Sequence, residues 1–350
     1  MMKATKKAIL GLTLFILGVF LVGTLVVKLD TKELWNTLTN FSPVGFVLVL
    51  ALTFLGTVVS SWRAYIILKS QCPDVKFLKL FNIWLAGHSI NYLTPFIYFG
   101  GEGIKAYLMK EKMNIPLDKT TSTLVFDRIL EISASLIMIG ISIGVFISYA
   151  GPVGFTKTIM SVIVSVASIA ALVIIFYFQV FRNKKLLAPI IRRIGADSTR
   201  AGKFFIRSEQ EVVDFFTVNR AVFWKGWAIS IVKQAVLISR HIALFYFLGK
   251  SINIVPVIVS LGALYAGLTV PIPASLGIQE AFQGISFSAV GLAAREGVAL
   301  SFVLRGADIL LAGVGIAILL RFGVGFMATA ARGLGEEPNM LKYNGESDKK

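Results

Sequence analysis

The chain alternates long apolar runs with short polar segments, and the length of each run predicts its structure. A helix needs about 20 apolar residues to cross a bilayer. Six runs have about that length or more, so we predict six transmembrane helices. They cover residues 8–27, 44–68, 120–149, 158–180, 224–248 and 297–320. A short helix over residues 30–40 should lie at the outer membrane surface. The fold class is therefore an all-α polytopic membrane protein.

Two further segments contain helix-breaking residues and charges: the apolar run 77–98 with the polar turns that follow it to 112, and the apolar run 254–292. Irregular backbone at membrane depth is tolerated where it is buried in protein or lines a cavity. We interpret each segment as a re-entrant hairpin of two short helices, the first entering from the inside and the second from the outside. The breaking residues are Pro95, Gly100 and Gly101 in the first hairpin and Pro271, Pro273 and Gly277 in the second.

The two halves of the chain match each other with a shift of 177 residues. The matched pairs are Arg63 with Arg240, Gly100 with Gly277, Arg128 with Arg305, and Glu131 with Asp308. Glu102 and Pro95 match Glu280 and Pro273 with one extra residue. Because the two hairpins enter from opposite sides, the repeats are predicted to be inverted, as in many alternating-access transporters.

This pattern defines a domain plan. A transmembrane domain covers residues 1–325, with repeat A at about 44–149 and repeat B at about 222–320. A basic linker, 181–221, connects them, and a polar cytoplasmic tail covers 326–350. The linker is either an amphipathic helix in the inner interface or a solvated loop held by anionic lipid headgroups.

Charge placement sets the orientation. The net charge is +16, yet only 15% of residues are charged. The predicted inner segments hold 25 of the 35 basic residues and the outer segments hold five, which places both termini in the cytoplasm and the protein in the cell membrane. We expect no nucleic-acid partner, because the aromatic and glycine signatures of RNA-binding modules are absent.

Cofactor and metal chemistry finds little support. Cys72 is the single cysteine, and His88 and His241 are the two histidines. These exclude an internal disulfide and a cysteine-based metal cluster. The Gly100–Gly103 segment lacks the Walker lysine pattern and a preceding strand, so ATP hydrolysis is not expected. We predict no cofactor and no metal.

Charged residues inside the predicted spans are the candidate site. An arginine at membrane depth costs roughly 2.5 kcal/mol or more, and arginine suits phosphate because its fork donates two parallel hydrogen bonds. One interpretation is two polar pockets, one opening inward and one outward, that bind an anionic headgroup. The other is a set of structural ion pairs, Arg128 with Glu131 and Arg305 with Asp308, each on one helix face. The candidate substrate-binding residues are Arg63, Asn91, Glu102, Asp127, Arg128, Glu131, Arg240, Glu280, Arg305 and Asp308.

Several of these residues have open roles. Glu102 and Glu280 either balance the arginines, carry a proton or coordinate a cation. We expect Asp127 to cap a helix or to pair with Lys119 or Lys105. Lys233 pairs with an acid of a neighbouring helix or contacts substrate. The two histidines are expected to be packed side chains and not proton relays.

At these residues the chain resembles the lysylphosphatidylglycerol synthase transmembrane-region family, described as flippase-like integral membrane proteins. The resemblance covers roughly residues 10–325. It rests on Asn91-x-x-x-Pro95, Gly100-Gly101-Glu102 with Lys105-Ala106-Tyr107-Leu108, Asp127-Arg128, Pro271-x-Pro273 with Leu276-Gly277-x-x-Glu280, and Arg305. The chain departs from the family pattern at Pro273-Ala274-Ser275, at Asp127 and at Lys105, where the family usually has Pro-Gly-Gly, Glu and Arg. The last two departures keep the charge.

The resemblance implies a lipid-translocating domain. Two-domain members of the family also carry a soluble aminoacyltransferase domain, which does not fit within 350 residues, so the synthase activity is not carried over. We therefore expect a flippase that moves an anionic or polyprenyl-phosphate-type lipid between leaflets through an arginine-lined site at the repeat interface. The alternatives are a membrane enzyme acting on a lipid phosphate and a lipid-binding scaffold for a lipid-synthesis enzyme.

Overall fold

The computed structural model describes residues 31–94, 100–150, 157–182, 187–193, 220–249, 253–268 and 275–322, with isolated positions between 195 and 213 and at Ile272. The predicted span 8–27, the breaking residues Pro95, Pro271 and Pro273, most of the linker and the tail 326–350 lie outside the described residues. Every regular element in the described part is a helix.

The long described helices fall where the apolar runs predicted them, and one short helix lies in the basic linker. They are α2 (Thr31–Thr39), α3 (Pro43–Gln71), α4 (Phe77–Leu93), α5 (Glu102–Met113), α6 (Leu117–Ala150), α7 (Lys157–Phe181), α8 (Leu187–Arg193), α10 (Arg220–Phe247), α11 (Ile254–Leu268), α12 (Ile278–Ala289) and α13 (Ala294–Arg321). By length and composition α3, α6, α10 and α13 are able to cross a membrane, as is expected of an integral membrane protein. Helix α7 occupies the position of another predicted span, and its residues Val166–Val180 form a shorter apolar helix.

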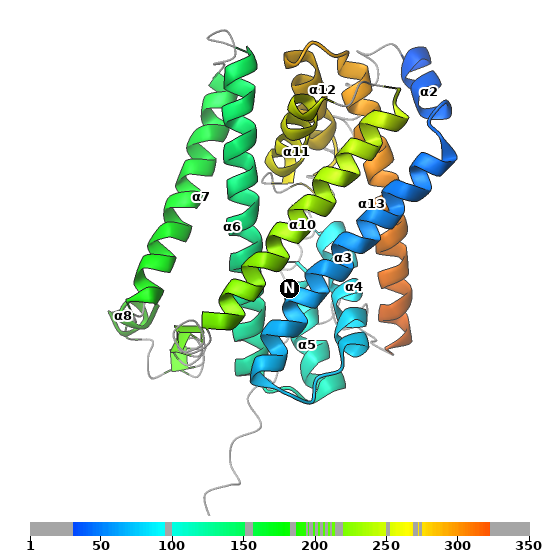
Figure 1. The fold of residues 1–350 in the computed structure, drawn as a ribbon. Helices are drawn as coiled ribbons and strands as arrows, with labels where there is room; N and C mark the ends of the chain where they lie inside the picture. Colours follow the sequence, from blue (N-terminus) through cyan, green and yellow to red (C-terminus); the bar gives the residue numbers. More distant parts are fainter. Residues whose placement is uncertain are drawn as a thin grey trace, which may run out of the picture.

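Each segment expected to form a hairpin contains a pair of short helices that contact each other. Helices α4 and α5 lie at the lower end of the molecule, and α11 and α12 lie at the upper end (Figure 1). The four helices have 17, 12, 15 and 12 residues. At about 1.5 Å per residue none reaches the roughly 30 Å of a bilayer core. No single helix of either pair is therefore long enough to cross a bilayer by itself.

Local chemistry explains where the second helix of each hairpin begins. A Cβ at Gly101 would lie 2.0 Å from the carbonyl oxygen of Gly87, so only glycine lets the start of α5 approach α4 this closely. Gly277 has a φ of 78° and directly precedes α12. This left-handed conformation favours glycine. Glycine is thus required just before α5 by the close approach to α4, and just before α12 by the left-handed backbone.

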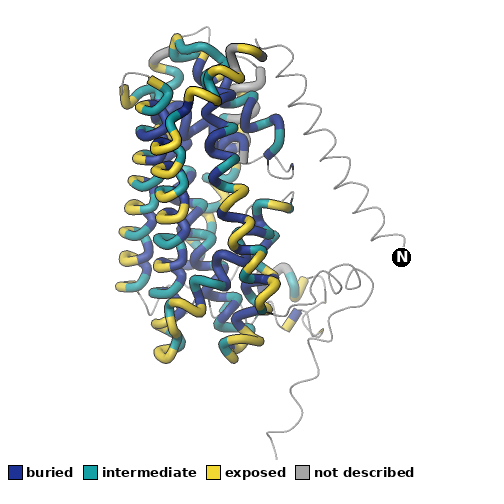
Figure 2. The backbone as a smooth tube through the Cα atoms, turned by 90° about the vertical axis from the view of Figure 1, so that its right-hand side faces the viewer, coloured by how far each residue is buried: buried dark blue, intermediate teal, exposed yellow. Residues whose placement is uncertain are grey.

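Helices α3 and α10 cross the centre of the molecule side by side, and the hairpins pack around them (Figure 1). One apolar cluster at the lower end includes Leu68, Leu80 and Leu108, and another at the upper end includes Phe245 and Phe287. Burial of one such side chain contributes about 1.5–3 kcal/mol. Figure 2 shows the buried positions along the interior of the bundle. The two clusters leave a polar region between them.

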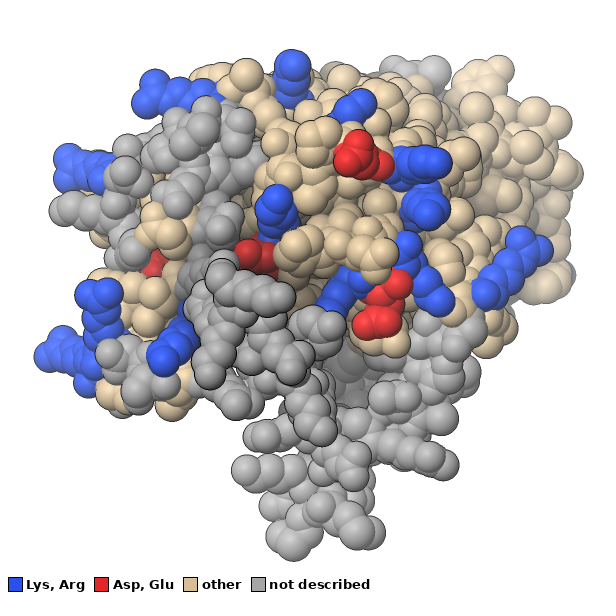
Figure 3. All heavy atoms as spheres, turned by 90° about the horizontal axis from the view of Figure 1, so that it is seen from below, with Lys and Arg blue, Asp and Glu red and all other residues tan. Residues whose placement is uncertain are grey.

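Basic side chains gather at the lower end of the molecule. Figure 3 shows Lys and Arg side chains across this face. The exposed ones at the ends of α3, α4 and α5 are Lys69, Lys76, Lys79, Lys110 and Lys112. The upper end has Lys32, Lys157 and Arg295 among the described residues (Figure 1). The charge asymmetry that the sequence predicted is therefore present in the fold.

Candidate functional site

A cavity of about 220 Å³ lies between the two apolar clusters, where both hairpins meet the long helices. Its wall is formed by α3, α4, α5, α6, α10, α11, α12 and α13, so both sequence repeats contribute to it. The lining residues are Thr53, Gly56, Thr57, Ser60, Arg63, Trp84, His88, Asn91, Tyr92, Lys105, Asp127, Arg128, Glu131, Lys233, Leu237, Arg240, Leu264, Tyr265, Gln279 and Asp308. Five of these are Lys or Arg and three are Asp or Glu, which leaves an excess of positive charge.

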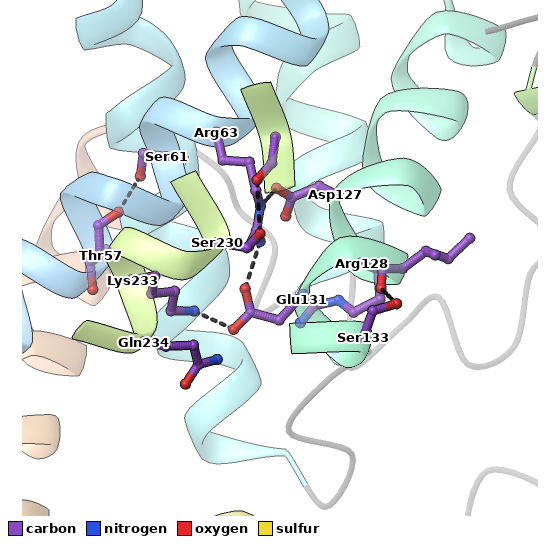
Figure 4. Close-up of polar contacts among 12 residues, drawn as sticks. Thr57, Ser61, Arg63, Asp127, Arg128, Glu131, Ser133, Ser230, Lys233 and Gln234 are labelled. Atoms are coloured by element: carbon purple, nitrogen blue, oxygen red, sulfur yellow. Dashed lines mark hydrogen bonds and ion pairs between the residues drawn. The ribbon is translucent and has the colours of Figure 1, made fainter. Parts of the chain in front are cut away.

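Arg63 on α3 lies at the first charged centre and is fully engaged. Its Nε donates to Asp127 at 2.7 Å, one Nη donates to Glu131 at 2.6 Å, and the other donates to the Ser230 hydroxyl at 3.0 Å. Lys233 on α10 forms a second ion pair with Glu131. Figure 4 shows these groups converging from three helices. Because Arg63 is only 2% exposed, this geometry satisfies a buried cation with two carboxylates.

This centre corrects one expectation and supports another. Asp127 pairs with Arg63, and the expectation that it would pair with Lys119 or Lys105 is wrong. The sequence cannot show that the two residues meet, because they are 64 positions apart. The expected pairing of Lys233 with an acid on a neighbouring helix is confirmed at Glu131.

The second charged centre ties the first hairpin to α6. Glu102 at the start of α5 forms ion pairs with Arg128 of α6 and, at 3.0 Å, with Lys105. The Lys105 ammonium lies 4.6 Å from the centre of the Trp84 ring, a cation–π geometry. Asn91 of α4 accepts a hydrogen bond from the Gly101 backbone N–H at 2.6 Å. Asn91 thus lines the cavity and also holds the backbone at Gly101, where α5 begins, against α4.

The second repeat contains equivalent pairs. Arg305 of α13 donates to Glu280 of α12 at 2.6 Å and 2.9 Å, as Arg128 does to Glu102. Glu280 also accepts from the Gly277 N–H at 2.8 Å. Arg240 of α10 pairs with Asp308 of α13 at 3.5 Å, as Arg63 does with Glu131. These pairs run between helices, whereas the structural interpretation from sequence placed them along a single helix.

The two repeats differ in how fully their arginines are bonded. Arg63 has three close partners, but Arg240 makes a 3.5 Å ion pair to Asp308 and a 3.3 Å hydrogen bond to the Thr53 hydroxyl. The Arg240 Nε is buried and makes no hydrogen bond within the described part of the chain, and the same holds for the Gln279 Nε2. Both residues line the cavity. The Arg240 Nε and the Gln279 Nε2 are therefore donors that no described residue accepts from.

The structure regroups the predicted site. Seven of the ten candidates line this cavity: Arg63, Asn91, Asp127, Arg128, Glu131, Arg240 and Asp308. These seven residues come from both halves of the chain, whereas the sequence interpretation assigned them to two pockets, one opening inward and one outward. The other three are not among its lining residues: Glu102 pairs with Arg128 of α6, and Glu280 pairs with Arg305 of α13.

The breaking residues have structural roles as far as they are described. Gly100 and Gly101 lie before α5, and Gly277 precedes α12. His241 is buried against the Leu237 carbonyl at 2.9 Å, which fits the packed role expected for it, while His88 lines the cavity.

The sequence interpretation missed much of the polar wall on α3. Thr53, Gly56, Thr57 and Ser60 were not singled out, although they line the cavity. Their spacing of three, four and seven residues places them on one helix face. This stripe of small and polar residues inside a predicted span was the available signal.

Comparisons with known proteins agree on one family. The family model described as "Lysylphosphatidylglycerol synthase TM region" matches residues 8–315. A UPF0104 membrane protein from Methanocaldococcus jannaschii is 25% identical over 304 residues, which cover 83% of this chain and 87% of the relative. Another, from Methanothermobacter thermautotrophicus, is 21% identical over 328 residues, covering 89% and 96% of the two chains. No solved structure matches the chain.

Proposed function

The chain belongs to the lysylphosphatidylglycerol synthase TM region family, and we propose that it is a lipid transporter that moves a phosphate-bearing lipid headgroup between leaflets. The headgroup passes through the central cavity while the acyl or prenyl chains stay in the bilayer. The observation that carries this proposal is the cavity itself. It lies between the two repeats, and its lining has five basic and three acidic side chains.

The charges of the cavity favour an anion. Arg240 is 5% exposed and holds its one described carboxylate partner at 3.5 Å, so its guanidinium keeps donors for an incoming phosphate. A guanidinium binds phosphate oxygens through two parallel hydrogen bonds. Gln279 lies in the first turn of α12, where the helix dipole adds positive potential. We assign Arg240 and Gln279 as the principal phosphate-binding groups.

The paired residues have a different role in this proposal. Arg63, Asp127, Glu131 and Lys233 form a nearly saturated network that holds α3, α6 and α10 together. The Glu102–Arg128 and Glu280–Arg305 pairs attach the hairpins to α6 and α13. Rocking of one repeat against the other would then expose the central site to each side in turn, as in other transporters with inverted repeats.

The orientation and partners follow from the charge pattern. We propose that the basic lower end faces the cytoplasm of the cell membrane, with both termini on that side. Membrane lipids with anionic headgroups are the proposed ligands, and a lipid-synthesis enzyme that supplies them is the proposed protein partner. Neither a nucleic acid nor a cofactor has a role.

Leaflet exchange in liposomes tests the proposal. Purified protein is reconstituted with fluorescent lipids that have phosphate-bearing headgroups, and the fraction reached by an external quencher is followed in time. We expect faster exchange than in protein-free liposomes, and slower exchange with Arg240→Ala. Exchange equal to protein-free liposomes for every phosphate-bearing lipid tested would refute transport. Mass spectrometry of the recovered lipid identifies any new product, which would instead favour an enzyme.

A further inference from the structure

One face of α3 forms a continuous polar surface along the cavity. Thr53, Gly56, Thr57 and Ser60 follow each other at helical spacing and all line the cavity. Thr53 accepts a hydrogen bond from Arg240, and the face continues to Arg63. Ten residues separate Thr53 from Arg63, which is about 15 Å along a helix. The face therefore connects the arginine of one repeat with its equivalent in the other.

Gly56, which has no side chain, lies at the middle of this face. It is buried within the protein, yet a Cβ placed on it would meet no atom within 4 Å. A buried glycine with open space beside it borders the cavity and does not serve close packing. Most other buried glycines here differ. Gly226, for example, would place a Cβ 2.5 Å from Leu130, and Gly262 would place one 2.2 Å from Ser142.

Independent features point to a ligand at this surface. The Arg240 Nε and the Gln279 Nε2 are buried, line the same cavity and make no hydrogen bond within the described residues. The Thr53 and Thr57 hydroxyls donate to carbonyls of their own helix, at 2.8 Å to Val49 and 3.3 Å to Thr53. A hydroxyl that donates in this way keeps acceptor capacity on its oxygen, and both threonines line the cavity. The wall thus offers both donors and acceptors to a polar group.

We propose that this α3 face is the path along which the lipid headgroup slides, and that Gly56 limits the size of the headgroup that passes. The inference rests on the proposed transport function and adds its route and its size-determining residue. A side chain at Gly56 would project into the cavity between the Arg240 and Arg63 levels. Larger side chains there would block larger headgroups first.

Cysteine accessibility tests the path without relying on transport. Cys72, the single cysteine of the chain, is replaced by serine, and Gly56→Cys or Ser60→Cys is introduced. A small, charged, thiol-specific reagent should modify both within the reconstituted protein, because a water-filled path lets the reagent in and the thiolate form. Leu55→Cys is the control, since Leu55 is 43% exposed on the outer surface of the same helix. In a membrane this surface faces lipid, where a charged reagent is scarce, so Leu55→Cys should react slowly. Modification of Gly56→Cys as slow as that of Leu55→Cys would overturn the path.

A substitution series tests the size limit. Gly56→Ala, Gly56→Val and Gly56→Leu should slow leaflet exchange in that order, with large headgroups affected first. Gly140→Leu on α6 is the matched control, because Gly140 also has open space at its Cβ but lies on the exposed surface. Both leucine variants should fold, since leucine has a higher helix propensity than glycine.

The outcomes separate the two proposals. If the wild-type protein exchanges lipid and Gly56→Leu exchanges it equally fast for headgroups of every size, the size limit is wrong and transport stands. If the wild-type protein exchanges no lipid, transport is wrong, and the size limit falls with it. The accessibility measurement then still decides whether the α3 face is open to water.

Discussion

Glu131 offers the most direct test of the charged network. Its carboxylate pairs with Arg63 at 2.6 Å and also with Lys233, and Arg63 is only 2% exposed. The change Glu131→Gln preserves the shape of the side chain but leaves two cations beside the single carboxylate of Asp127. Breaking a buried ion pair by removing one partner costs about 3–5 kcal/mol. We expect the free energy of unfolding to fall by about that amount.

Thermal unfolding of the purified protein in detergent measures this loss. The entropy of unfolding is about 2.1 cal/mol/K per residue, or roughly 0.7 kcal/mol/K for 350 residues, so a decrease in Tm of about 4–7 °C is expected. Asp308→Asn is the matched control in the second repeat. Its ion pair to Arg240 is 3.5 Å long and its side chain is 21% exposed, so removing its charge should cost less than removing that of Glu131, which pairs with two cations at once.

A second substitution tests the cause. Combining Glu131→Gln with Lys233→Met removes the excess cation along with the missing anion, so part of the lost stability should return. Coupling between contacting residues is about 0.5–3 kcal/mol. The reasoning is refuted if Glu131→Gln is as stable as Asp308→Asn. It is also refuted if the stability loss of the double variant equals the sum of the losses of the two single variants.

Three further predictions concern the cavity and the first hairpin. Arg240→Ala should reduce leaflet exchange about tenfold or more, because a hydrogen bond to a charged group contributes about 1.5–3 kcal/mol. The Tm should change little, because Arg240 has only long contacts to lose. Unaltered exchange in liposomes would contradict this prediction. Asn91→Ala removes the 2.6 Å bond to the Gly101 N–H and should lower the free energy of unfolding by about 1–3 kcal/mol, measured by denaturant titration. Gly101→Ala forces a Cβ to within 2.0 Å of the Gly87 carbonyl oxygen, so faster proteolysis of the α4–α5 hairpin is expected, whereas Gly103→Ala, with open space, should resist as the wild type does.

Much of the fold could be predicted from hydrophobic patterning. The bounds of α3, α6, α10 and α13 follow the apolar runs because a helix must satisfy its own backbone hydrogen bonds within a bilayer. The hairpin breaks at Gly101 and Gly277 were also predictable, since breakers within apolar runs are costly unless the fold needs them. The repeat correspondence of Arg63 with Arg240 identified groups that later prove to make equivalent ion pairs.

The sequence alone determined that this is a helical membrane protein with charged groups inside two matching halves. Only the tertiary structure decided which charges neutralise each other, because Arg63 meets Asp127 and Glu131 across 64 and 68 positions of the chain. Tertiary packing also decided that both halves share one cavity, and that Arg240 is held less tightly than Arg63. Periodicity fixes which face of a helix a residue occupies, but the partner of that face depends on how the helices cross.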